Sequence, residues 1–70
     1  LAGQHALRDW IQGCLDKMSP IHRIPLVLHL LSGLELGDIA RILAVPEGSI
    51  KSRLFHARKR MAICLQENDQ

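Results

Sequence analysis

The chain has 70 residues, and its nine basic and seven acidic side chains give a formal net charge of only +2. A chain of about this length supports one hydrophobic core, which excludes two domains. Hydrophobic residues make up 47% of the total, which excludes a disordered polar tail. We therefore expect a single domain over residues 1–70. Because the chain starts at Leu1 rather than at a methionine, we expect it to be a piece of a longer protein.

The composition favours helices in an aqueous environment. Leu, Ala, Ile, Arg and Lys are frequent, whereas Tyr is absent and Val occurs only at positions 27 and 45, a mixture typical of helices. The most apolar run, residues 24–31, contains a proline and a histidine and is shorter than the roughly 20 apolar residues that a membrane span requires. No secretory signal is visible at the start. These features predict a soluble, cytoplasmic, all-α domain without membrane contact.

Apolar residues at steps of three and four predict a first amphipathic helix over about residues 4–18. They are Leu7, Trp10, Ile11, Cys14, Leu15 and Met18. Cys14 and Cys64 lack CxxC spacing, and both fall on apolar helix faces. We therefore expect two buried, reduced thiols rather than a disulfide.

A second helix is expected over residues 20–32. Ser19 and Pro20 form a start signal, because serine can cap free amides and proline is tolerated at the first helical position. Gly33 can adopt the left-handed conformation that ends a helix. Pro25 removes an amide hydrogen bond, so we expect a distorted first turn or a helix that effectively starts near this proline.

A short third helix over residues 36–44 and a long fourth helix over residues 46–65 complete the prediction. The apolar residues of the third helix are Leu36, Ile39, Ala40 and Leu43. The residue before Pro46 disfavours helical backbone angles, which ends the third helix, and Pro46 can be the first residue of the fourth helix. A short helix, a tight turn and a longer basic helix form a helix-turn-helix. The expected fold is thus a small domain of four helices containing a helix-turn-helix without a wing.

The fourth helix has two chemically different sides when its residues are placed about 100° apart. One side is apolar and consists of Ile50, Leu54, Ala57, Met61, Cys64 and Leu65. The opposite side holds Lys51, Ser52, Phe55, His56 and Lys59, with Arg53, Arg58 and Arg60 on the flanks. We expect the apolar side to face the core.

Charge is unevenly distributed along the chain, since residues 48–65 contain five basic and no acidic side chains. The second helix of a helix-turn-helix enters the major groove, where flanking arginines suit phosphates and projecting residues contact base edges. Lys51 suits guanine, and Phe55 suits a thymine methyl group. Two alternatives remain: Phe55 packs under the N-terminal region or in a dimer contact, or the basic face is merely solvated.

Nothing in the sequence indicates catalysis, a cofactor or a metal site. The acidic residues are scattered, and no nucleophile elbow or phosphate loop occurs. The histidines His5, His22, His29 and His56 lack the ligand spacing of a zinc site. We expect His29 to be a partly buried helix residue, and we expect the protein not to be an enzyme.

Residues 18–61 resemble region 4 of sigma-70 family sigma factors, especially those of the extracytoplasmic-function group. The family pattern is L-S-P, an apolar helix, G-L-S-x-x-E-I-A-x-I-L, and then P-x-G-T-V-K-S-R-L-x-x-A-R. Here the three stretches read M-S-P at residues 18–20, G-L-E-L-G-D-I-A-R-I-L at 33–43, and P-E-G-S-I-K-S-R-L-F-H-A-R at 46–58. Glu35 replaces the usual capping serine, Pro25 replaces an apolar helix former, and His56 replaces a frequent arginine.

The resemblance implies recognition of the promoter −35 element as double-stranded DNA, docking on the β flap of the RNA polymerase core, and restraint by an anti-sigma factor. It implies no melting of the −10 element. By position, Lys51, Ser52, Phe55 and His56 would face bases, while Ser49 and Arg53 would hold phosphates. The full predicted DNA-binding set is Ser49, Lys51, Ser52, Arg53, Phe55, His56, Arg58 and Lys59.

Two other functions fit the same pattern. One is the helix-turn-helix output domain of a response-regulator-type transcription factor, which dimerises through an extra helix. The other is a sigma-like protein-interaction module that binds an anti-sigma factor and has lost DNA contact.

Overall fold

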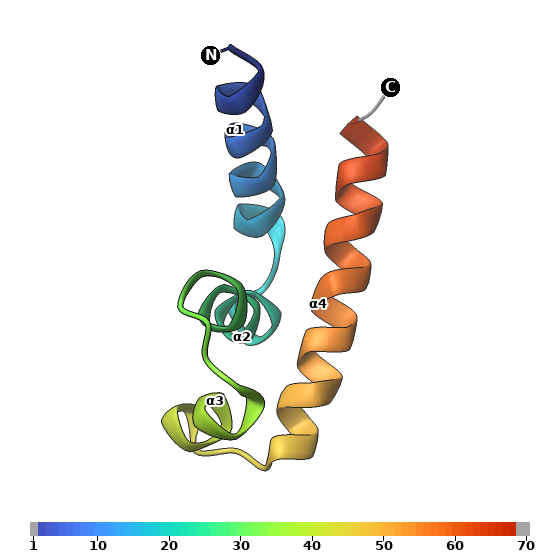
Figure 1. Cartoon of the computed structure of the whole chain (residues 1–70). Coiled ribbons are helices and arrows are strands. Elements are labelled where there is room, and N and C mark those ends of the chain that lie inside the picture. Colours follow the sequence, from blue (N-terminus) through green and yellow to red (C-terminus); the bar gives the residue numbers. More distant parts are fainter. Residues whose placement is uncertain (1, 69–70) are drawn as a thin grey trace.

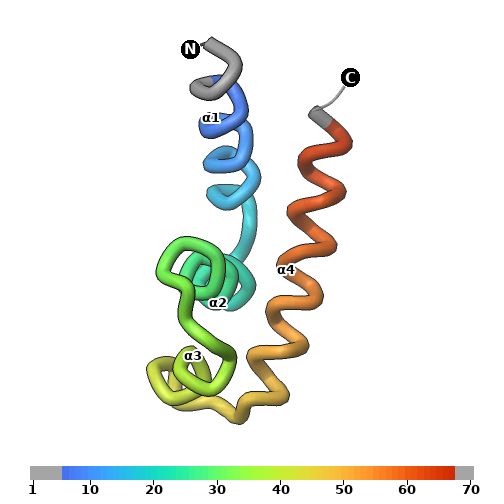
Figure 2. The backbone as a smooth tube through the Cα atoms, viewed as in Figure 1, coloured from blue at the N-terminus to red at the C-terminus, as the bar shows by residue number. Residues whose placement is uncertain are grey.

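The computed structural model describes residues 2–68, in which three shorter helices pack along one long helix (Figure 1). The helices are α1 (Ala2–Lys17), α2 (Pro20–Leu31), α3 (Leu36–Leu43) and α4 (Glu47–Asn68). The trace in Figure 2 shows α1 and the end of α4 side by side and running in opposite directions, with α3 beside the start of α4. All regular secondary structure in the described residues is helical, which confirms the all-α prediction and the order of the helices. The last helix continues past its predicted end at residue 65.

One hydrophobic core joins α2, α3, α4 and the residue that follows α1. Its buried members are Met18, Leu26, Ile39, Ala40, Ile50, Leu54 and Ala57. Ile39 and Ile50 are 0% exposed, and complete burial of such a side chain stabilises the fold by roughly 1.5–3 kcal/mol. Three of the seven members lie on α4, so α4 is the element on which the others pack.

The apolar stripe of α1 is covered only over its second half. Cys14 and the following Met18 are buried, whereas Leu7 is 52% exposed and Ile11 is 37% exposed. The reason is that α1 projects beyond α2 and α3 (Figure 1), so the core ends before its first turns. The periodicity predicted the helix correctly but not how much of its apolar face is buried.

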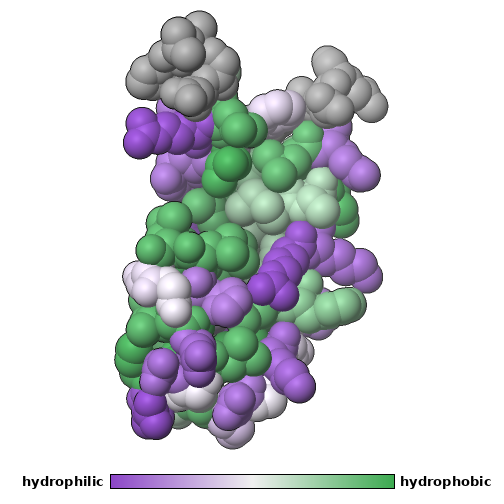
Figure 3. Space-filling model, in the orientation of Figure 1, coloured by the Kyte–Doolittle hydropathy of each residue, from purple (hydrophilic) through white to green (hydrophobic). Residues whose placement is uncertain are grey.

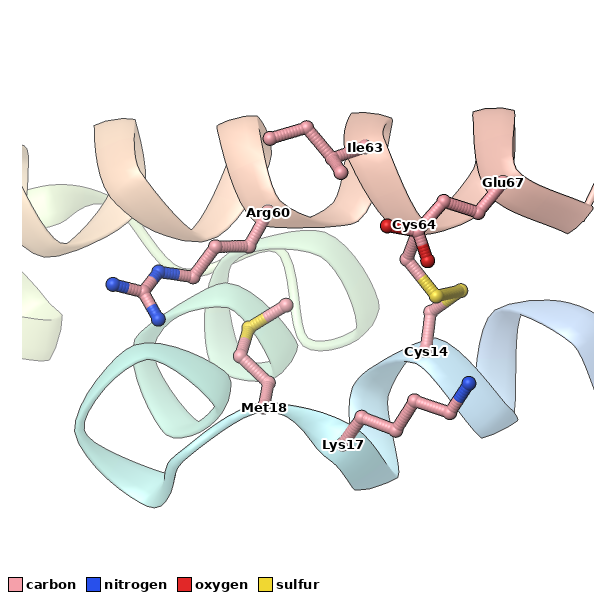
Figure 4. A pocket seen from close by; sticks show the side chains of 7 residues that line it. All are labelled: Cys14, Lys17, Met18, Arg60, Ile63, Cys64 and Glu67. Carbon is pink, nitrogen blue, oxygen red and sulfur yellow. A yellow bond between two sulfur atoms is a disulfide. The ribbon is translucent and has the colours of Figure 1, made fainter.

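The two cysteines form a disulfide, so the expectation of reduced thiols is wrong. Cys14 of α1 is bonded to Cys64 of α4, with Cα atoms 5.8 Å apart and a sequence separation of 50 residues (Figure 4). Cys14 is buried, as expected, whereas Cys64 is half-buried. The antiparallel course of α1 and α4 brings these distant positions together, and the spacing of the cysteines alone does not reveal that arrangement.

The second helix begins at Pro20, as predicted, but Ser19 does not cap it with its side chain. The Ser19 carbonyl accepts a hydrogen bond from the Arg23 amide at 2.9 Å, while its hydroxyl pairs with Nδ1 of His22 at 3.0 Å. Pro25 lies buried inside a continuous helix, so the predicted start near Pro25 is wrong. Its ring adds apolar contact to the core, which offsets the hydrogen bond that proline removes.

Two residues with positive φ separate the last three helices. Gly33, with φ of 67°, confirms the left-handed residue expected after α2. Ala44 also has a positive φ, 57°, and ends α3, although this conformation costs about 1 kcal/mol for alanine. The next amide, of Val45, donates to the Ala40 carbonyl at 3.0 Å, a bond typical of a helix C-terminus. The chain then turns into α4, which begins at Glu47, one residue after its predicted start.

Candidate nucleic-acid interface

The fourth helix is buried on one side and open on the other. Ile50 and Ala57 are 0% exposed and Leu54 is 3% exposed, while Met61 and Leu65 are half-buried. These values confirm the predicted core face. Because α3 and the turn at Ala44 pack beside the start of α4, this part of α4 is held as the second helix of a helix-turn-helix.

The predicted DNA-binding residues lie between positions 49 and 59 of α4. Those with exposed side chains are Lys51, Ser52, Phe55, His56, Arg58 and Lys59. Ser49 and Arg53 are half-buried beside them. The fold thus brings all eight residues together on one helix, and their contact with DNA stays a prediction.

Phe55 is the most unusual side chain on this surface, because it is 61% exposed. With this exposure, Phe55 is not packed under the described part of the N-terminal region, whereas a dimer contact of Phe55 stays a prediction. Its ring meets the His56 ring edge-on at 5.4 Å, and the Lys59 ammonium lies 5.7 Å from its centroid. Phe55 and Lys59 line a shallow depression together with Lys51 and Arg58, in which an aromatic face lies among cations. Such a surface suits contact with both bases and phosphates.

The basic side chains of α4 are not neutralised by neighbouring acids. The ion pair found within residues 2–68 joins Arg41 to Asp38 on α3. No acidic residue occurs between positions 48 and 66. The positive charge of α4 is therefore available to an anionic partner.

His22 of α2 is close to this surface, although the sequence prediction did not include it in the interface. Its ring lies 6.1 Å from the His56 ring, with the two planes at 74°. Burial lowers the pKa of the His22 imidazole below its ordinary value of 6.5, and the charges of Arg60, His56 and Arg53 lower it further. The crossing of α2 over α4 creates this contact, and no local sequence signal indicates it.

Several large apolar side chains are exposed outside the DNA-binding set. They are Leu7, Ile11, Ile21, Ile24, Leu30, Leu31, Ile42 and Ile63. Figure 3 shows hydrophobic side chains over the region of α1 and α2, with hydrophilic side chains beside them. Extended apolar surface of this kind suits contact with other proteins.

A search of the described residues for metal sites and membrane spans finds neither. No three His, Cys, Asp or Glu side chains within residues 6–67, whose side chains the structure describes, gather in a group that could hold a metal ion. Nor does any helix in this part of the chain have the length and apolar character needed to cross a bilayer. His29 is half-buried, as predicted, and its Nδ1 pairs with the Leu34 carbonyl at 2.8 Å.

Comparison with known protein families agrees with the observed helices. Residues 8–61 match the model of the family described as sigma-70, region 4, and this match extends from α1 through the helix-turn-helix into the second half of α4. A search of curated proteins finds no match. The family comprises DNA-binding helix-turn-helix domains of transcription factors rather than enzymes. Because the match covers most of the chain and its four helices, this chain belongs to the sigma-70 region 4 family.

Proposed function

We propose that the chain recognises the promoter −35 element as double-stranded DNA, as region 4 of a sigma factor of the extracytoplasmic-function group. The observation that carries this proposal is the two-sided α4, with Ile50 and Leu54 buried while Lys51 and Phe55 project outward. The major groove admits one such helix. Base-facing residues then lie at the centre of the contact, and cations at its edges reach the phosphates.

Each projecting side chain has a role that its chemistry supports. Lys51 donates to guanine, Ser52 donates to or accepts from a base edge, and Phe55 contacts a thymine methyl group. His56 stands where the family frequently has arginine, and its ring nitrogens can donate to or accept from a base edge. Arg58 and Lys59 would contact phosphates.

The protein partners proposed from the resemblance are the β flap of the RNA polymerase core and an anti-sigma factor, both in the cytoplasm. The exposed apolar residues of α1 and α2, such as Ile11 and Ile24, support contact with proteins outside the DNA-binding face. An anti-sigma factor that covered both the apolar and the basic surfaces would exclude DNA.

The first test measures the binding of the 70-residue chain to duplex DNA at several salt concentrations. We expect weak binding whose log affinity falls by about 0.9 per log unit of salt for each phosphate contacted. Selection of bound sequences from a random duplex pool at stated salt would then define the preferred element. Binding that is absent or insensitive to salt would contradict the proposal and favour the protein-interaction module.

Single substitutions separate base contacts from phosphate contacts. We expect Lys51→Ala and Phe55→Ala to relax the sequence preference, and Arg58→Ala to weaken binding to all duplexes alike. Affinities for the selected duplex and for a random duplex measure the difference. Equal losses on both duplexes in all three variants would contradict the assigned roles.

The response-regulator alternative receives less support, because the family match covers residues 8–61 and the K-S-R sequence at residues 51–53 fits the sigma pattern. That alternative requires a dimer on DNA. The stoichiometry of the complex with duplex DNA distinguishes the two, since we expect one chain per site.

A further inference from the structure

We infer that His22, Arg53 and Arg60 form a phosphate-binding site at the edge of the DNA-contacting face, so that α2 binds DNA together with α4. The inference rests on the duplex binding proposed above. It adds a DNA contact from a helix to which the sequence prediction assigned none.

The three side chains come from two crossing helices. His22 lies in the first turn of α2, and its ring is 6.1 Å from that of His56, a predicted base-facing residue. Arg53 and Arg60 lie on the same edge of α4, about 10 Å apart along the helix axis. Figure 4 shows Arg60 extending from α4 toward α2 beside Met18.

The site is positively charged, and the acidic residue that shares a pocket with Arg60 is Glu67, near the end of α4. Neither α2 nor the stretch of α4 between residues 48 and 66 contains an acidic residue. No ion pair among the described side chains of residues 6–67 involves His22, Arg53 or Arg60. Charges of one sign held close together repel each other, and an anion placed between them removes that repulsion. DNA phosphates flank the major groove, so a site beside a base-facing residue meets the backbone of one strand.

A hydrogen bond between Ser19 and His22 occupies one of the two ring nitrogens of His22. Ser19 Oγ lies 3.0 Å from Nδ1 of His22. When the hydroxyl donates to Nδ1, the neutral imidazole carries its proton on Nε2, which can donate to a phosphate oxygen. Protonation of the ring then adds a charge to the same contact.

A bound phosphate also places a negative charge next to His22, whose charged neighbours in the free chain are positive. In the free chain, burial and the charges of Arg60, His56 and Arg53 lower the pKa of its imidazole below 6.5. An anion beside the ring favours the protonated form and raises this pKa. DNA binding therefore takes up protons at His22, and the affinity rises as the pH falls from the bound pKa toward the free pKa.

The test compares variants of the 70-residue chain on a duplex of about two helical turns. We expect His22→Gln and Arg60→Gln each to weaken the affinity roughly three- to tenfold. Arg60→Gln should also reduce the slope of log affinity against log salt by about 0.9. The matched control Arg8→Gln removes an exposed base from α1 and should leave that slope unchanged.

A second measurement needs no substitution, so it does not depend on a variant folding. Titration of the His22 ring by nuclear magnetic resonance should give a pKa below 6.5 in the free chain and a higher pKa when duplex is saturating. Normal DNA binding with unchanged slopes and an unchanged His22 pKa would overturn this inference alone. Failure of the unsubstituted chain to bind duplex would overturn the proposed function as well.

Discussion

Reducing the disulfide between Cys14 and Cys64 is expected to lower the free energy of unfolding by about 4 kcal/mol, since the bond closes a loop of 50 residues. The loss is large relative to the several kcal/mol expected for a domain of about this size. Leu7 and Ile11 are exposed on α1, so few apolar contacts hold its first half once the bond is broken.

Urea unfolding with and without a dithiol reductant measures this effect. The control is the double variant Cys14→Ser with Cys64→Ser, which should unfold at the midpoint of the reduced chain and should not respond to the reductant. Equal midpoints for the oxidised and reduced chains would contradict the prediction. In the cytoplasm proposed above for this chain, thiols are generally kept reduced, so the stability of the reduced form would decide how much of the domain is folded.

Substitutions of the adjacent residues Ile50 and Lys51 should affect different properties, because Ile50 is buried in the core and Lys51 is exposed on α4. Ile50 is 0% exposed, so Ile50→Ala removes apolar contacts and leaves a cavity in the core. Its expected cost is about 2–5 kcal/mol of stability. Lys51 is exposed, so Lys51→Ala should change stability by no more than about 0.5 kcal/mol while relaxing the DNA sequence preference.

Measuring unfolding and DNA binding for both variants tests the two-sided character of the helix. Ile50→Ala should shift the urea midpoint strongly, and any loss of DNA binding should follow the loss of folded protein. A stable Ile50→Ala variant together with an unfolded Lys51→Ala variant would mean that the core lies on the other side of α4.

The sequence predicted those features that depend on periodicity within one helix. Ile50, Leu54 and Ala57 recur at steps of three and four, and all three are buried. Gly33 was predicted to be left-handed because glycine pays no steric cost for a positive φ. These features could be predicted because neighbouring residues along the chain determine them.

The features that the sequence did not predict depend on how the helices pack. The disulfide requires α1 and α4 to be antiparallel, and the proximity of His22 and His56 requires α2 to cross α4. Pro25 lies buried inside a continuous α2, a position that its neighbours along the chain do not indicate. Ala44 adopts a positive φ because the hydrogen bonds that end α3 compensate for the strain.

The central claim is that the exposed face of α4 contacts DNA, and the most direct measurement maps amide chemical shifts while duplex is added to the chain. We expect the largest changes at residues 49–59 of α4, with a smaller set at the start of α2. Changes confined to the exposed apolar residues of α1, or no changes at all, would contradict the claim.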